Sequence, residues 1–145
     1  MANLPNFQLD YIFFIYGLSF FVLAAVCFFL WKLKYSDFPW VWLGLFGVVH
    51  GVNEWFDLVS VSIYDSFAFS AVRLLTLSIS FLFLFEFARR GYGLLSGKLY
   101  NKGIYLILLI SVLLGGIFGL NGIHFTSRYF LGFLSSAFAG ISVYN

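Results

Sequence analysis

Ionisable and amide side chains recur at helical spacing within one otherwise apolar stretch of the chain. His50, Glu54 and Asp57 are separated by four and then three residues, so on a helix all three side chains share one face, and Asn53 borders it. Imidazole and carboxylate groups can exchange protons or hold a polar ligand. Because such groups are costly in an apolar helix, the pattern predicts a site that faces a bundle interior or a water-filled cavity.

A single arginine in the next apolar stretch supplies the complementary charge. Glu54 and Arg73 are equally far in sequence from the middle of the short segment 61–66, which separates the two stretches. Two antiparallel helices would therefore hold both residues at a similar depth. We expect a Glu54–Arg73 ion pair, with Asp57 as a competing partner, because the planar guanidinium suits a carboxylate.

Long apolar stretches predict the elements that position these residues. Apolar residues make up 62% of the sequence and charged residues 10%, against about 45–50% and 25% in soluble domains. At about 1.5 Å per residue, a helix of roughly 20 residues crosses a hydrocarbon core. The expected fold class is all-α integral membrane, with one domain over residues 1–145. Its five predicted transmembrane helices cover about 11–31, 39–60, 67–87, 103–120 and 129–144.

Basic residues between these helices are distributed unequally. The segments that would lie on one side of the membrane hold only Arg128. Those on the other side hold Lys32, Lys34, Arg89, Arg90, Lys98 and Lys102. Since basic residues favour the cytoplasmic side, the N-terminus is expected outside and the C-terminal end in the cytoplasm.

The loop 121–128 falls on the outer side, where it adds His124 and Arg128 to the polar residues of the helices. The inner half of the bundle is apolar as far as the basic loops. The sequence therefore predicts a ligand-binding pocket that opens outward, built from His50, Asn53, Glu54, Asp57, Arg73, His124 and Arg128.

Structural interpretations of the same residues stay open. The ion pair would also serve simply to lock two helices together. His50 is equally explained as a core histidine bonded to a carbonyl or to Glu54, and His124 as an ordinary loop residue.

Two further patterns are local. Glu86 precedes Arg89 and Arg90 by three and four residues, which predicts ion pairs along one helix. Gly47 and Gly51 are four residues apart, a spacing typical of helices that approach closely.

Cofactor and enzyme functions find little support. Haem ligation by His50 and His124 would need both rings at one iron, yet their expected depths differ by about 10–15 Å. A metal at His50, Glu54 and His124 has suitable ligand types, but no spacing requires it. The cofactor therefore stays unknown. No nucleotide-binding or hydrolase motif occurs, so no enzyme activity is expected of this chain, and thinly spread basic residues argue against nucleic acid.

Several stretches, including LGLFGVVHGVNEWFDL and VRLLTLSISFLFLFEFARRG, resemble the N-terminal multi-helix membrane sensor region of bacterial PAS/histidine kinase or PAS/GGDEF signalling proteins. The resemblance covers most of the chain. Its most specific element is HGxxEW, here His50, Gly51, Glu54 and Trp55. It implies a sensory input domain in the bacterial inner membrane, in a homodimer or larger assembly. It also implies a longer protein, since no PAS, kinase or cyclase domain follows within the sequence.

Two other classes of function remain as alternatives. A short, Phe-rich chain without catalytic motifs also suits an accessory or structural subunit of a larger membrane complex. A small transport or channel unit would use the polar stripe as a path, although the inner half lacks polar residues and inverted repeats are not evident.

Overall fold

The computed structural model describes residues 4–62, 66–97 and 132–144, together with the single positions 103, 105, 110, 125, 126 and 129. The elements of this part are all helices: α1 (Leu4–Lys32), α2 (Trp40–Ser62), α3 (Phe67–Ser96) and α6 (Gly132–Tyr144). The all-helical prediction is confirmed for these residues. The predicted helix 103–120 lies almost wholly outside the described residues.

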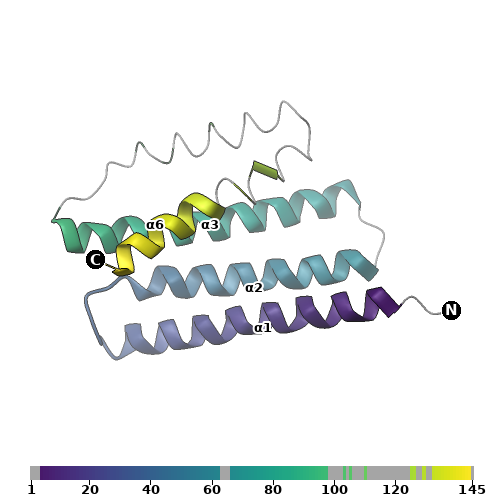
Figure 1. Ribbon diagram of the computed structural model, residues 1–145, viewed down its shortest axis with the longest axis horizontal. Helices are drawn as coiled ribbons and strands as arrows, with labels where there is room; N and C mark the ends of the chain where they lie inside the picture. Colours follow the sequence, from purple (N-terminus) through teal and green to yellow (C-terminus); the bar gives the residue numbers. More distant parts are fainter. Residues whose placement is uncertain are drawn as a thin grey trace.

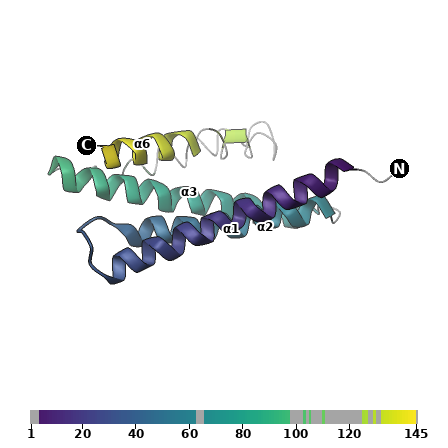
Figure 2. The same cartoon turned by 60° about the horizontal axis from the view of Figure 1, so that its bottom comes forward.

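The three long helices α1, α2 and α3 are each antiparallel to the next one along the chain (Figure 1). The start of α1, the end of α2 and the start of α3 lie at one end of the bundle, and the α1–α2 loop lies at the other. Figure 2 shows α6 against α3, on the side away from α1 and α2. Since α2 packs against both α1 and α3, it is the central helix of the described bundle.

The boundaries of α3 follow from its sequence. Ser66 caps its start, where the hydroxyl oxygen accepts a hydrogen bond from the amide of Phe69 at 3.3 Å. Gly97 ends it with φ 68°, in the left-handed region that glycine adopts without strain. The helix therefore continues nine residues beyond the predicted end at residue 87, as far as Ser96.

Of the described helices, two are long and apolar enough to cross a membrane, α1 over Tyr11–Lys32 and α3 over Phe67–Ser96. Only 17% of the apolar stretch of α1 and 22% of that of α3 are buried within the protein, whereas the core helix of a soluble protein is mostly buried. Many large apolar side chains of both helices therefore point outward. In α2, polar residues interrupt the apolar run between His50 and Asp57.

Glycine residues bring α1 and α2 into close contact. A Cβ atom at Gly47 would lie 2.7 Å from the carbonyl oxygen of Phe20, and one at Gly51 would lie 3.0 Å from that of Gly17. Both obstacles are backbone atoms, which cannot swing aside. The predicted role of the Gly47 and Gly51 spacing is thus confirmed. The same contact seats α2 with its polar face toward α3.

Substituting Gly47→Ala should loosen this contact. Overpacking of this kind typically costs about 1–3 kcal/mol, more than the gain of about 1 kcal/mol from replacing glycine in a helix. We expect the unfolding transition in mixed micelles, followed by circular dichroism, to move to lower denaturant. Gly140→Ala is the matched control, because no described atom lies within 4 Å of a Cβ at that position. Equal effects of the two substitutions would contradict close α1–α2 packing.

Candidate functional site

The polar residues predicted on one face of α2 are buried together in the bundle. The exposed fractions of His50, Asn53, Glu54 and Asp57 are 8%, 1%, 6% and 5%. Polar side chains at such depth need partners within the protein or a bound ligand. The prediction that this stripe faces the bundle interior is therefore confirmed.

Arg73 of α3 reaches across to Asp57 of α2. Its Nε donates to Asp57 Oδ1 at 2.8 Å, and its terminal amino group contacts the same oxygen. The arginine side chain is 18% exposed and that of the aspartate 6%, so the pair is largely shielded from water. This ion pair ties the two helices together near the end of the bundle where α2 leads into α3.

Asp57, which the sequence analysis named as a competing partner, contacts Arg73. Side chains on a helix lean toward its N-terminus, and α3 begins at the α2–α3 connection. The long arginine side chain therefore reaches back toward that connection, to the level of Asp57. Glu54 lies one turn deeper, where its carboxylate Oε1 is 3.5 Å from His50 Nε2. The expected Glu54–Arg73 contact stays a prediction.

His50 forms a second polar contact between α2 and α3. Its Nδ1 lies 3.0 Å from the hydroxyl oxygen of Ser80, which itself donates to the carbonyl of Leu77 at 2.7 Å. The tautomer of His50 decides whether Nδ1 donates to this hydroxyl or accepts from it. The other ring nitrogen, Nε2, is left facing Glu54. The interpretation of His50 as a core residue beside Glu54 thus fits its position.

Serine, histidine and glutamate in contact raise the question of a hydrolytic triad. In such a triad the histidine accepts the proton of the serine and so activates its oxygen. Here the carbonyl oxygen of Leu77, 2.7 Å away, competes with His50 for the hydroxyl proton of Ser80. Ser80 is also fully buried. A nucleophile must be reached by its substrate, so complete burial argues against this role for Ser80.

Asn53 lies on α2 between Asp57, which contacts Arg73, and His50, which contacts Ser80. It is 1% exposed, and its side-chain oxygen has no hydrogen-bond partner among the described residues. Buried polar atoms are almost always satisfied, by water or a ligand where protein groups do not reach. A bound donor would satisfy an acceptor that none of the described residues reaches.

A cavity of about 420 Å³ adjoins the polar residues. Its size falls within the range of small-molecule sites, about 300–1,000 Å³. His50 and Glu54 are its polar walls from α2, and Tyr16 adds a phenol from α1. The remaining lining residues are apolar: Ile12, Phe13, Leu77 and Phe81. The site thus combines an apolar chamber with a few polar groups on one side.

Two of the predicted site residues, His124 and Arg128, lie outside the described residues. Of the predicted set, the structure therefore brings together His50, Asn53, Glu54, Asp57 and Arg73. Among the residues that the structure describes, no group of three or more His, Cys, Asp or Glu side chains could hold a metal ion. His124, the third ligand considered for such a site, lies outside these residues.

A separate polar cluster surrounds Glu86, toward the other end of α3. Its carboxylate accepts hydrogen bonds from Arg89 at 2.8 Å on both oxygens, from Arg90 Nε at 2.5 Å and from the hydroxyl of Tyr105. The predicted local pairs of Glu86 with Arg89 and Arg90 are confirmed. Tyr105 is an addition that spacing did not reveal, and it ties a distant part of the chain to α3.

No family model, characterised protein or solved structure matches this chain. The chemistry of the site is therefore argued from its own residues, and the resemblance to bacterial sensor regions stays a prediction.

A double-mutant cycle should show that Asp57 and Arg73 act as one unit. Asp57→Leu or Arg73→Met alone leaves a buried charge without this partner, which typically costs about 3–5 kcal/mol. The double variant removes both charges, so we expect it to recover most of the loss. Unfolding in mixed micelles gives the three values, and Asp37→Leu, at an exposed aspartate, is the control. Additive losses in the double variant would contradict the pairing.

Proposed function

We propose that this chain is the membrane-embedded sensory input domain of a bacterial signal-transduction protein, and that the polar site between α2 and α3 is its sensing element. The observation that carries the proposal is the buried Asp57–Arg73 pair, which joins two helices one turn from a largely apolar cavity that His50 and Glu54 line. The expected resemblance through the HGxxEW element points to the same class of protein.

The proposal includes a five-helix transmembrane bundle in the bacterial inner membrane, with the N-terminus outside and the C-terminal end in the cytoplasm. Two apolar helices with mostly outward-facing side chains support a lipid environment. The basic residues Lys32, Lys34 and Arg90 belong to the end of the bundle that holds the α1–α2 loop. This end would be cytoplasmic, which places the Asp57–Arg73 pair in the outer half of the membrane.

Sensing would depend on two relative positions of α2 and α3, one of which the ion pair stabilises. A charge left alone in an apolar interior is costly, so the pair holds α2 and α3 in one relative position. A polar ligand or a proton that binds one partner better in another arrangement would shift the population toward that arrangement. Small movements between packed helices are a common form of such transitions.

The cavity gives such a stimulus a place to bind. His50 and Glu54 line it. The Asn53 side-chain oxygen, on the same helix but outside the lining, has no hydrogen-bond partner within the part of the chain that the structure describes. A small molecule with at least one hydrogen-bond donor and an apolar body fits these walls. Binding at Glu54 would act on Asp57 through less than one turn of α2.

The test is to replace the pair in the natural gene of the host cell. Asp57→Asn and Arg73→Gln should each change signalling output, measured as cyclic dinucleotide level and transcript profile, by about fivefold or more. Thr76→Val is the matched control, because the Thr76 hydroxyl is exposed and donates only locally to the carbonyl of Val72 at 2.9 Å. Variants that insert normally but match the wild type, while a gene deletion alters the profile, would contradict the proposal.

A further inference from the structure

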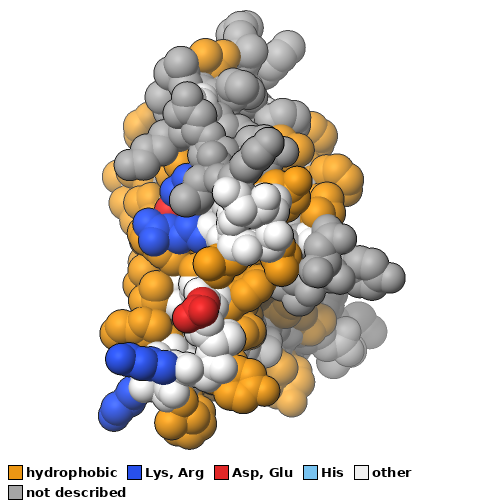
Figure 3. Space-filling view, turned by 90° about the vertical axis from the view of Figure 1, so that its left-hand side faces the viewer, with side chains coloured by type: hydrophobic (Ala, Val, Ile, Leu, Met, Phe, Trp, Pro, Cys, Tyr) orange, Lys and Arg blue, Asp and Glu red, His pale blue; other side chains and the backbone are white. Residues whose placement is uncertain are grey.

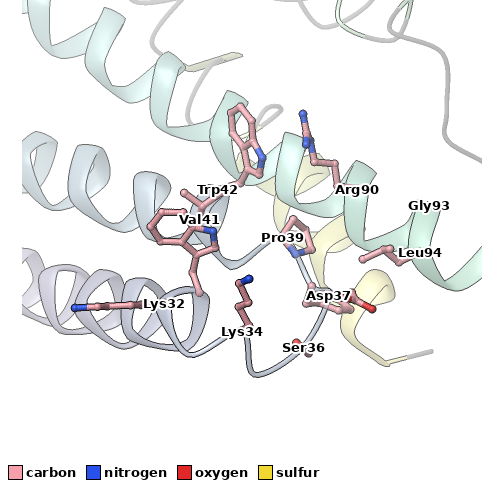
Figure 4. Close-up of a pocket in the computed structure, with 12 residues that line it drawn as sticks. Lys32, Lys34, Ser36, Asp37, Pro39, Val41, Trp42, Arg90, Gly93 and Leu94 are labelled. Carbon is pink, nitrogen blue, oxygen red and sulfur yellow. The ribbon is translucent and has the colours of Figure 1, made fainter.

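A second and larger cavity lies at the opposite end of the bundle from the Asp57–Arg73 pair. Its volume is about 750 Å³, and it is lined by the end of α1, the α1–α2 loop, the start of α2 and the late part of α3 (Figure 4). Three of its lining residues are cations, Lys32, Lys34 and Arg90, and one is an anion, Asp37. The charged lining therefore favours an anionic ligand.

The remaining walls are largely aromatic and aliphatic, and include Trp31, Phe38 and Trp42. In the view of this end of the molecule, Lys and Arg side chains stand among apolar ones (Figure 3). Arg90 packs over the Trp42 ring, with its guanidinium carbon 4.9 Å from the ring centroid. Cations beside exposed apolar and indole surface are typical of the boundary between lipid and water.

Lys34 carries the more specific evidence. It ends α1 in the left-handed region at φ 49°, the one positive φ at a non-glycine residue in the described chain. Its amide bonds to the carbonyl of Trp31, and the amide of Tyr35 bonds to that of Leu30, which together form the Schellman motif that usually ends in glycine. Gly97 occupies the corresponding left-handed position after α3.

A lysine at this position is strained where glycine would be relaxed. Strained residues persist where the side chain has a function, so the outlier points to a use for the ammonium group. Figure 4 shows Lys34 rising from the loop between the ends of α1 and α2, with Trp42 and Arg90 side by side above it and Lys32 lying along α1 at the edge. Lys34 is thus the central cation of the cavity.

We propose that this cavity binds the phosphate group of an anionic phospholipid, with Lys34 as its main contact. Arg90, whose Nε is held by Glu86, and Lys32, at the edge, add positive charge. The acyl chains would continue along the outward-facing apolar side chains of α1 and α3. This inference rests on the membrane-spanning part of the proposed function and is independent of any sensory role.

Native mass spectrometry of the purified chain in detergent tests the site by counting bound lipids. Wild-type protein should bind phosphatidylglycerol several-fold more tightly than zwitterionic phosphatidylcholine. Lys34→Gly should weaken phosphatidylglycerol binding roughly fivefold, the contribution of one basic residue at an anionic surface. Asp37→Asn should tighten it, because the carboxylate competes with the phosphate for the cations.

Lys34→Gly also separates binding from folding. Glycine relieves the strain at φ 49°, so the unfolding temperature of this variant should equal or exceed that of the wild type while lipid binding falls. Lys34→Arg, which keeps the charge, should retain binding. Equal binding of the two lipids, or wild-type binding by Lys34→Gly, would overturn the proposal. If an equal concentration of sn-glycerol 3-phosphate displaced the lipid, the ligand of the cavity would be a soluble phosphate compound, and the proposal of a phospholipid would be wrong.

Discussion

The pairing of Arg73 with Asp57 across two apolar helices is the interaction on which the rest of the described bundle depends. An arginine inside such a helix needs an acceptor at its own depth, and only one relative position of α2 and α3 provides it here. The same position brings His50 opposite Ser80. On each helix, this second contact lies seven residues farther from the α2–α3 connection than the ion pair does. Two polar contacts thus fix a single antiparallel register.

The remaining packing accommodates that register. The polar face of α2 turns toward α3, and the adjacent face carries Gly47 and Gly51, which allow backbone contact with α1. The large apolar side chains of α1 and α3 consequently point outward, where a bilayer would solvate them. Where three helices meet beside His50 and Glu54, the side chains leave a cavity of about 420 Å³.

Much of this arrangement can be predicted from sequence, because it follows from periodicity. Spacing placed His50, Glu54 and Asp57 on one face, and the short connection after α2 placed Arg73 beside that face. Spacing named both Glu54 and Asp57 as partners of Arg73, and the contact with Asp57 follows from side-chain direction, since an arginine leans toward the start of its helix. The contact of Ser80 with His50 is also predictable from sequence, because Ser80 follows Arg73 by the same seven residues that separate His50 from Asp57. The Tyr105–Glu86 contact carries none, since it depends on how a distant segment folds back.

Hydrogen–deuterium exchange in lipid nanodiscs tests the central claim most directly, because it reports on each helix separately. If the Asp57–Arg73 pair holds α2 to α3, Arg73→Gln should raise exchange in α2 around Asp57 as well as in α3 around residue 73, while the Gly47 region packed on α1 stays protected. An increase confined to α3, with α2 as protected as in the wild type, would contradict the account.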